Sequence, residues 1–174
     1  MTDLDLPPPD DVLERALALA LDQARAAAAR DEVPVGAAVL GPDGELLAAD
    51  HNRIEEQRDP TAHAERLVLS AACAAAGTTR LPAGSLLAVT LEPCAMCAGA
   101  IVLARPRWLL FGALDPKAGA CGSLRDIVRD PRLNHRVVLL PRRRESECGQ
   151  LLTEFFRARR QQPAWDCGAP LHSR

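Results

Sequence analysis

Two short motifs hold residues whose types and spacing suit metal-assisted hydrolysis. They are Thr61-Ala62-His63-Ala64-Glu65 and Pro93-Cys94-Ala95-Met96-Cys97. One imidazole and two thiolates give three zinc ligands, and a catalytic zinc site leaves its fourth position open for water, whereas a structural site has four protein ligands. The motifs therefore predict a catalytic zinc centre held by His63, Cys94 and Cys97. Glu65 adds a carboxylate that can move protons without binding the ion.

The charges of this centre would let it ionise water at neutral pH. Two thiolates cancel the charge of Zn²⁺, and zinc in such a site lowers the pKa of its water to about 7. Glu65 would pass the proton of that water to a ring nitrogen and help ammonia leave an amidine-like carbon. In a regular helix His63 and Glu65 point apart, so we expect the centre to lie at a helix start.

The hydropathy pattern and the turn signals predict which elements position these motifs. In chain order we expect a helix from Asp10 or Asp11 to about Arg30, strands at 37–40 and 46–49 around Pro42-Asp43-Gly44, a loop at 54–59, a helix from Pro60 to about Ala76 with Asp59 as its cap, a strand at 85–91, a helix at 95–104, a strand at 107–112, a short helix near 124–129, a strand at 136–140 and a helix at 145–160. This order predicts an α/β fold, a three-layer α/β/α sandwich with a central mixed five-stranded sheet.

Composition describes an ordinary globular protein. Of 174 residues, 48% are apolar and 25% charged, and the net charge is −2, so a nucleic-acid partner would need a local basic patch. We expect a flexible leader at 1–9, a single domain at 10–161 and a loose tail at 162–174. The N-terminus lacks the apolar core of a signal peptide, and no apolar run approaches the ~18 residues of a membrane span. With six cysteines, two of them in a C-x-x-C, these features favour the cytoplasm.

His-x-Glu followed by Pro-Cys-x-x-Cys resembles the signature of the zinc-dependent nucleoside and nucleobase deaminases. Further blocks are similar to the bacterial tRNA-specific adenosine deaminases, and together they span residues 12 to 160. These blocks are Val33-Pro34-Val35-Gly36, Asn52-Arg53, Asp59-Pro60, Thr90-Leu91-Glu92, Phe111-Gly112-Ala113, Asp115 with Lys117, Gly122-Ser123-Leu124, Asn134-His135-Arg136-Val137 and Phe155-Phe156-Arg157.

The resemblance implies a cytidine deaminase-like fold, one Zn²⁺ per subunit, a homodimer, and conversion of the wobble adenosine of a tRNA anticodon stem-loop to inosine. It also implies roles for substrate-binding residues. Asn52 would hydrogen-bond the flipped base, Asp115, Lys117 and Asn134 would line the path of the anticodon loop, and Phe155, Phe156 and Arg157 would flank it. Arginines at 142–144 and at 157, 159 and 160 could supply a basic patch.

Other interpretations remain open at this stage. Asn52 and Asn134 also suit turns, Asp115 and Lys117 a solvated loop, the arginines a solvated face, and Phe155 and Phe156 the packing of the last helix. A guanine, cytosine or nucleoside deaminase of the same fold would act on free small molecules. A non-catalytic, zinc-stabilised RNA-binding subunit is the other alternative, but it would have no use for Glu65.

Overall fold

A five-stranded mixed sheet organises the computed structural model, which describes residues 6–161. The strands lie in the order β2 (Leu46–His51), β1 (Gly36–Leu40), β3 (Leu86–Leu91), β4 (Trp108–Ala113) and β5 (Val138–Leu139). β1 is antiparallel to both neighbours, and β3, β4 and β5 are parallel. Residues 1–5, from the expected leader, and the expected tail at 162–174 lie outside the described residues.

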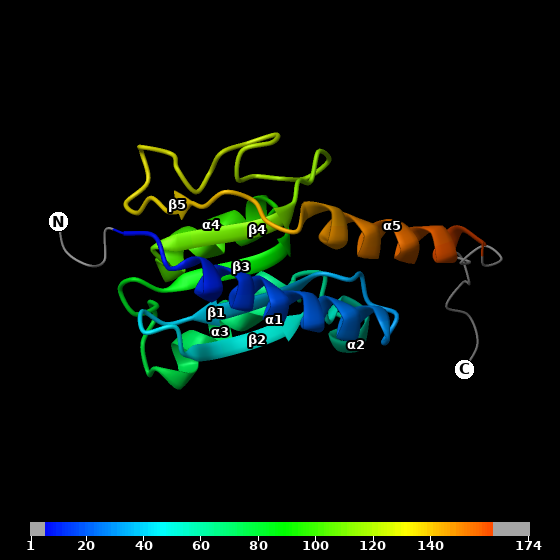
Figure 1. Cartoon of the computed structure of the whole chain (residues 1–174), viewed down its shortest axis with the longest axis horizontal. Coiled ribbons are helices and arrows are strands. Elements are labelled where there is room, and N and C mark those ends of the chain that lie inside the picture. The colour runs from blue at the N-terminus through cyan, green and yellow to red at the C-terminus, as the bar shows by residue number, and fades with distance from the viewer. Residues whose placement is uncertain (1–5, 162–174) are drawn as a thin grey trace, which may run out of the picture.

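Helices cover both faces of this sheet (Figure 1). The helices are α1 (Asp10–Ala28), α2 (Ile54–Gln57), α3 (Ala64–Ala75), α4 (Ala95–Ala104) and α5 (Glu145–Gln161). α1 and α5 pack on one face, and α3 and α4 on the other (Figure 1). The predicted three-layer sandwich is therefore confirmed.

Side chains of β3 point alternately to the two faces of the sheet, and the core is divided into two clusters accordingly. Leu87 and Val89 pack with α3 and α4, whereas Leu86 and Ala88 pack with α1. Successive side chains of a strand point to opposite faces. A strand covered on both faces is therefore apolar throughout, as the run 86–89 is.

Three local predictions were wrong. α3 begins at Ala64, not at Pro60, because Asp59 accepts hydrogen bonds from the backbone N–H and hydroxyl of Thr61 and forms a turn. The polar loop at 54–59 contains the short helix α2. No helix forms at 124–129, where backbone N–H and C=O groups instead bond back to residues 119–122.

The sheet topology brings the two motifs to one edge. β2 and β3 are both antiparallel to β1, so their C-terminal ends point the same way. α3 follows β2 after a connection that contains the short helix α2, and α4 follows β3 directly, so both helices start at this edge. Among the described residues, no helix is long and apolar enough to cross a membrane.

Candidate active site

His63, Cys94 and Cys97 converge where α3 and α4 begin. The Nδ1 atom of His63 lies 3.8 Å from the Sγ atom of Cys94 and 3.6 Å from that of Cys97. All three ligand atoms lie within 4.8 Å of one another. The sequence thus identified three side chains that the fold brings together from two distant segments.

Helix boundaries explain this convergence. His63 and Cys94 are the residues just before α3 and α4, and both have extended backbone conformations. Because His63 stands outside its helix and Glu65 in its first turn, the two side chains face one centre. The free N–H groups and positive end of each helix favour negative charge there, which suits thiolates.

The donor set fits zinc. Zinc lies about 2.3 Å from thiolate sulfur and about 2.0–2.1 Å from imidazole nitrogen, so tetrahedral ligands of these kinds are about 3.5 Å apart. The observed sulfur–nitrogen distances of 3.6 and 3.8 Å are close to that value. His63, Cys94 and Cys97 would therefore hold the ion with little movement.

The two thiols interact through a hydrogen bond. A hydrogen bond from the Cys97 thiol, together with His63, lowers the pKa of Cys94 to about 3. The same bond and burial raise the pKa of Cys97. The pair therefore holds a proton that a metal ion would displace on binding.

Glu65 lies at the same centre and is only 4% exposed. Its carboxylate lies next to the Cys97 thiol. Burial raises the pKa of Glu65, which brings a carboxyl group closer to the range in which it can both accept and return a proton.

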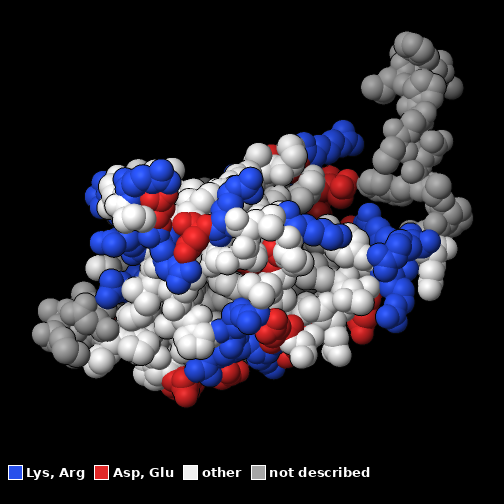
Figure 2. All heavy atoms as spheres, turned by 90° about the horizontal axis from the view of Figure 1, so that it is seen from above, with Lys and Arg blue, Asp and Glu red and all other residues white. Residues whose placement is uncertain are grey.

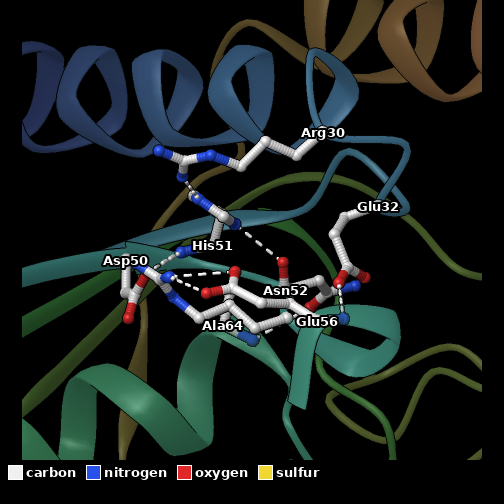
Figure 3. Close-up of polar contacts among 8 residues, drawn as sticks. Arg30, Glu32, Asp50, His51, Asn52, Glu56 and Ala64 are labelled. Carbon is white, nitrogen blue, oxygen red and sulfur yellow. Dashed lines mark hydrogen bonds and ion pairs between the residues drawn. The ribbon is translucent and has the colours of Figure 1, made fainter. Parts of the chain in front are cut away.

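Asn52, at the end of β2, joins the site through its side chain (Figure 3). It is buried, and its Oδ1 atom accepts a hydrogen bond of 2.9 Å from the backbone N–H of Ala64, between His63 and Glu65. Within residues 6–161 no side-chain or backbone partner is recorded for its Nδ2 group. That group is therefore available as a donor.

The buried side chain of His51 contacts the backbone of Asn52. The Nε2 atom of His51 lies 2.5 Å from Nη1 of Arg30, and its Nδ1 atom lies 2.7 Å from the carbonyl oxygen of Asn52 (Figure 3). Arginine can only donate, so Nε2 accepts and Nδ1 carries the hydrogen donated to Asn52. From the sequence alone, this histidine could not be distinguished from an ordinary core residue.

A groove of about 690 Å³ lies between the loop after β4 and helix α5. Asp115 and Lys117 line it from the loop, and Phe156 and Arg160 line it from α5. Phe155 forms an edge-to-face pair with Phe156 and lies under the guanidinium of Arg159. The fold thus brings Asp115 and Lys117 together with the terminal helix.

Asn134 lies elsewhere. It lines a second hollow, beside β5, with Arg107, Arg129, His135 and Arg136. The structure does not bring it into the groove of Asp115 and Lys117.

The arginine clusters differ from each other. Arg142, Arg143 and Arg144 all form ion pairs with acidic side chains, so they offer little free positive charge. Arg157 and Arg160 are exposed near the end of α5, where Figure 2 shows basic side chains gathered at the right of the view. Arg159 donates to the backbone oxygen of Asp31.

Glu92 is a buried acid that the motif analysis did not single out. It is 2% exposed and accepts four hydrogen bonds from the loop after β4. Burial alone would raise the pKa of Glu92, but these bonds outweigh burial and lower it. The available sequence signal was a charged residue between an apolar strand and Pro93.

Comparison with known families agrees with this geometry. Residues 10–113 match the family model of the cytidine and deoxycytidylate deaminase zinc-binding region, which covers both predicted motifs. The chain belongs to this deaminase family.

Relatives define the branch within it. The chain is 47% identical over 138 residues to the tRNA-specific adenosine deaminase of Bacillus subtilis (strain 168), covering 79% of this chain and 84% of that protein. It is 49% identical over 142 residues to the protein of the same name from Agrobacterium fabrum, covering 82% and 92%. The chain therefore belongs with the tRNA-specific adenosine deaminases.

Solved structures resemble it as well. A structure from work on tRNA:A34 deaminases that edit A to I at the wobble position matches with a TM-score of 0.76 and 46% identity, covering 80% of this chain and 99% of that one. A guanine deaminase from Nitrosomonas europaea matches with a TM-score of 0.68 and 28% identity, covering 89% and 97%.

Proposed function

We propose that this protein hydrolyses the 6-amino group of a wobble adenosine in tRNA, giving inosine and ammonia. The single observation that carries the proposal is the convergence of His63, Cys94, Cys97 and Glu65 at one edge of the sheet. The relatives supply the substrate, because those with 45–49% identity are named for tRNA adenosine deamination.

The roles of the residues follow from their positions. His63, Cys94 and Cys97 would hold one zinc ion per subunit, which when bound activates water for attack on the base. Glu65 would take a proton from that water and return it to the base and the leaving amine. Asn52 would donate from its Nδ2 group to the flipped base, while its Oδ1 atom stays on Ala64.

The groove between the loop and α5 would take the anticodon loop. RNA loops are recognised by splayed bases that stack on aromatic rings, with cationic side chains on phosphates. Phe156 is 44% exposed in this groove, beside Lys117 and Arg160. Phe155 and Arg157 would assist from the same helix, and Asn134 would contact RNA from the separate hollow beside β5.

A homodimer is part of the proposal, and α4 supports it. Every residue of α4 is apolar, and such a helix is expected to be buried on all sides. One stripe is nevertheless exposed, with Met96 at 38% and Leu103 at 72%. A side-chain carbon at Gly99, on the same stripe, would meet no atom within 4 Å. A second copy of the chain would cover this surface.

The proposal places the whole activity in one domain, residues 10–161, working in the cytoplasm where its tRNA substrate resides. A leader at 1–9 and a tail at 162–174 would be dispensable for turnover.

A comparison of substrates tests the proposal. The zinc-loaded protein is given an anticodon stem-loop RNA with adenosine at the wobble position or, separately, guanine, cytosine or free adenosine, and ammonia release is measured. We expect turnover of the RNA. Turnover of free guanine alone would favour the activity of the Nitrosomonas relative instead.

A further inference from the structure

The loop at 115–123 is built around one buried carboxylate. Oε1 of Glu92 accepts hydrogen bonds from the backbone N–H groups of Cys121 and Ser123, both at 3.0 Å. Oε2 accepts from the N–H of Asp115 at 3.1 Å and from the hydroxyl of Ser123 at 2.5 Å. These four donors come from both ends of the loop, so the loop closes on Glu92.

Close packing reinforces this arrangement. A side-chain carbon added at Gly119 would lie 2.4 Å from Cδ of Glu92 and 2.2 Å from Oγ of Ser123. The loop backbone therefore passes against the carboxylate with no room for a larger residue.

The same loop touches the metal-ligand segment. Gly119 forms a β-bridge with Cys94, and the N–H of Ala120 donates to the carbonyl of Pro93 at 2.9 Å. At its start, Asp115 accepts from the N–H groups of Lys117 and Ala118. The conformation that Glu92 fixes thus also fixes where Asp115 and Lys117 stand at the groove.

We propose that Glu92 is a positioning residue, whose carboxylate folds residues 115–123 into one conformation and so presents Asp115 and Lys117 to the substrate. The consequence for the substrate rests on the proposed function. The folding of the loop on Glu92 does not.

The change Glu92→Gln keeps the shape and replaces one acceptor atom with a donor. Whichever way the amide turns, its NH₂ group faces a backbone N–H group of the loop, which leaves a buried N–H without an acceptor. The loop should therefore open more often. Glu45→Gln, at an exposed position of the β1–β2 hairpin, is the matched control.

The chain itself supplies the probe, because Lys117 is its only lysine. A lysine-specific protease can cut only after Lys117, inside the loop, and cleavage of a folded protein reports local opening. In the zinc-loaded protein without RNA, we expect Glu92→Gln to be cut at Lys117 at least about tenfold faster than the native chain or Glu45→Gln. Equal cleavage rates would overturn the proposal.

Kinetics distinguish positioning from a merely structural role. We expect Glu92→Gln to keep its zinc and to raise KM for the stem-loop RNA by about tenfold, with kcat within about twofold of native. Loss of zinc, or a fall in kcat at constant KM, would mean that Glu92 acts on Cys94 instead, and would overturn the proposal.

Gly119→Ala, which displaces the loop but keeps the charge, should reproduce the faster cleavage and the raised KM. If Glu92→Gln does not fold, the cleavage rate and KM of Gly119→Ala test whether the loop conformation positions the substrate. If the native protein leaves RNA unchanged, the proposed function fails, while the cleavage rates still decide how the loop is held.

Discussion

The side-chain oxygen of Asn52 accepts a hydrogen bond from the backbone N–H of Ala64, the residue between the candidate metal ligand His63 and Glu65. This one contact ties the end of β2 to the start of α3. It leaves the NH₂ group of the same side chain available for the proposed contact with the base, so the two ends of one amide would have separate tasks.

Two substitutions separate these tasks. Asn52→Ala removes both ends, so we expect a loss of about 1–3 kcal/mol of folding stability in denaturant titration. Asn52→Asp keeps an acceptor for Ala64 and removes only the donor, so it should keep more of that stability than Asn52→Ala. Both changes should lower kcat/KM for stem-loop RNA, roughly 10- to 100-fold. Native turnover in Asn52→Asp would remove Asn52 from base recognition.

His51 should matter for stability more than its partner Arg30. His51→Phe leaves the buried carbonyl of Asn52 without its donor, which costs about 1–3 kcal/mol. Arg30 is exposed, so in Arg30→Ala water can replace it at Nε2 and the cost should stay below about 1 kcal/mol. Urea unfolding of both variants measures the difference. Equal costs would contradict the tautomer assigned to His51.

Much of this architecture was predictable, and the failures have physical causes. Apolar runs such as 86–89 and 95–104 gave β3 and α4 within a residue or two, because an uninterrupted apolar run bounded by turn residues is a clear signal. The predicted start of α3 was four residues too early, because the Asp59 side chain accepts a hydrogen bond from the backbone N–H of Thr61 and forms a turn there. That error concealed how His63 and Glu65 come to face one centre.

The candidate site was likewise predictable only where a local sequence pattern exists. His63, Glu65, Cys94 and Cys97 were identified because their chemistry needs those residue types at that spacing. The supporting roles of His51 and Glu92 depend on contacts with Arg30 and Ser123, which lie far away in sequence and leave no local pattern.

Glu65 should be needed for turnover and not for metal binding. Glu65→Gln keeps the size of the side chain and removes its ability to carry a proton, so kcat should fall by about 10²–10⁴. Zinc content by elemental analysis should equal that of the native protein, because the ligands are unchanged. A variant that still turns over RNA at the native rate would exclude Glu65 as the proton carrier.

The exposed stripe of α4 predicts the assembly state. Leu103→Glu places a charge on the most exposed apolar residue of that helix, so the proposed dimer should dissociate to monomers. Light scattering during gel filtration gives the mass directly. Leu46→Glu, at an exposed leucine of β2, is the control and should leave the mass unchanged. A native protein that is already monomeric would contradict the dimer.

The side chains of His63, Cys94 and Cys97 would form one metal centre. X-ray absorption at the zinc edge, with elemental analysis of the purified protein, tests this centre. We expect one zinc ion per chain bound by two sulfurs and one imidazole nitrogen, with no fourth side chain. A protein that binds no zinc, or that surrounds it with four side chains, would contradict it.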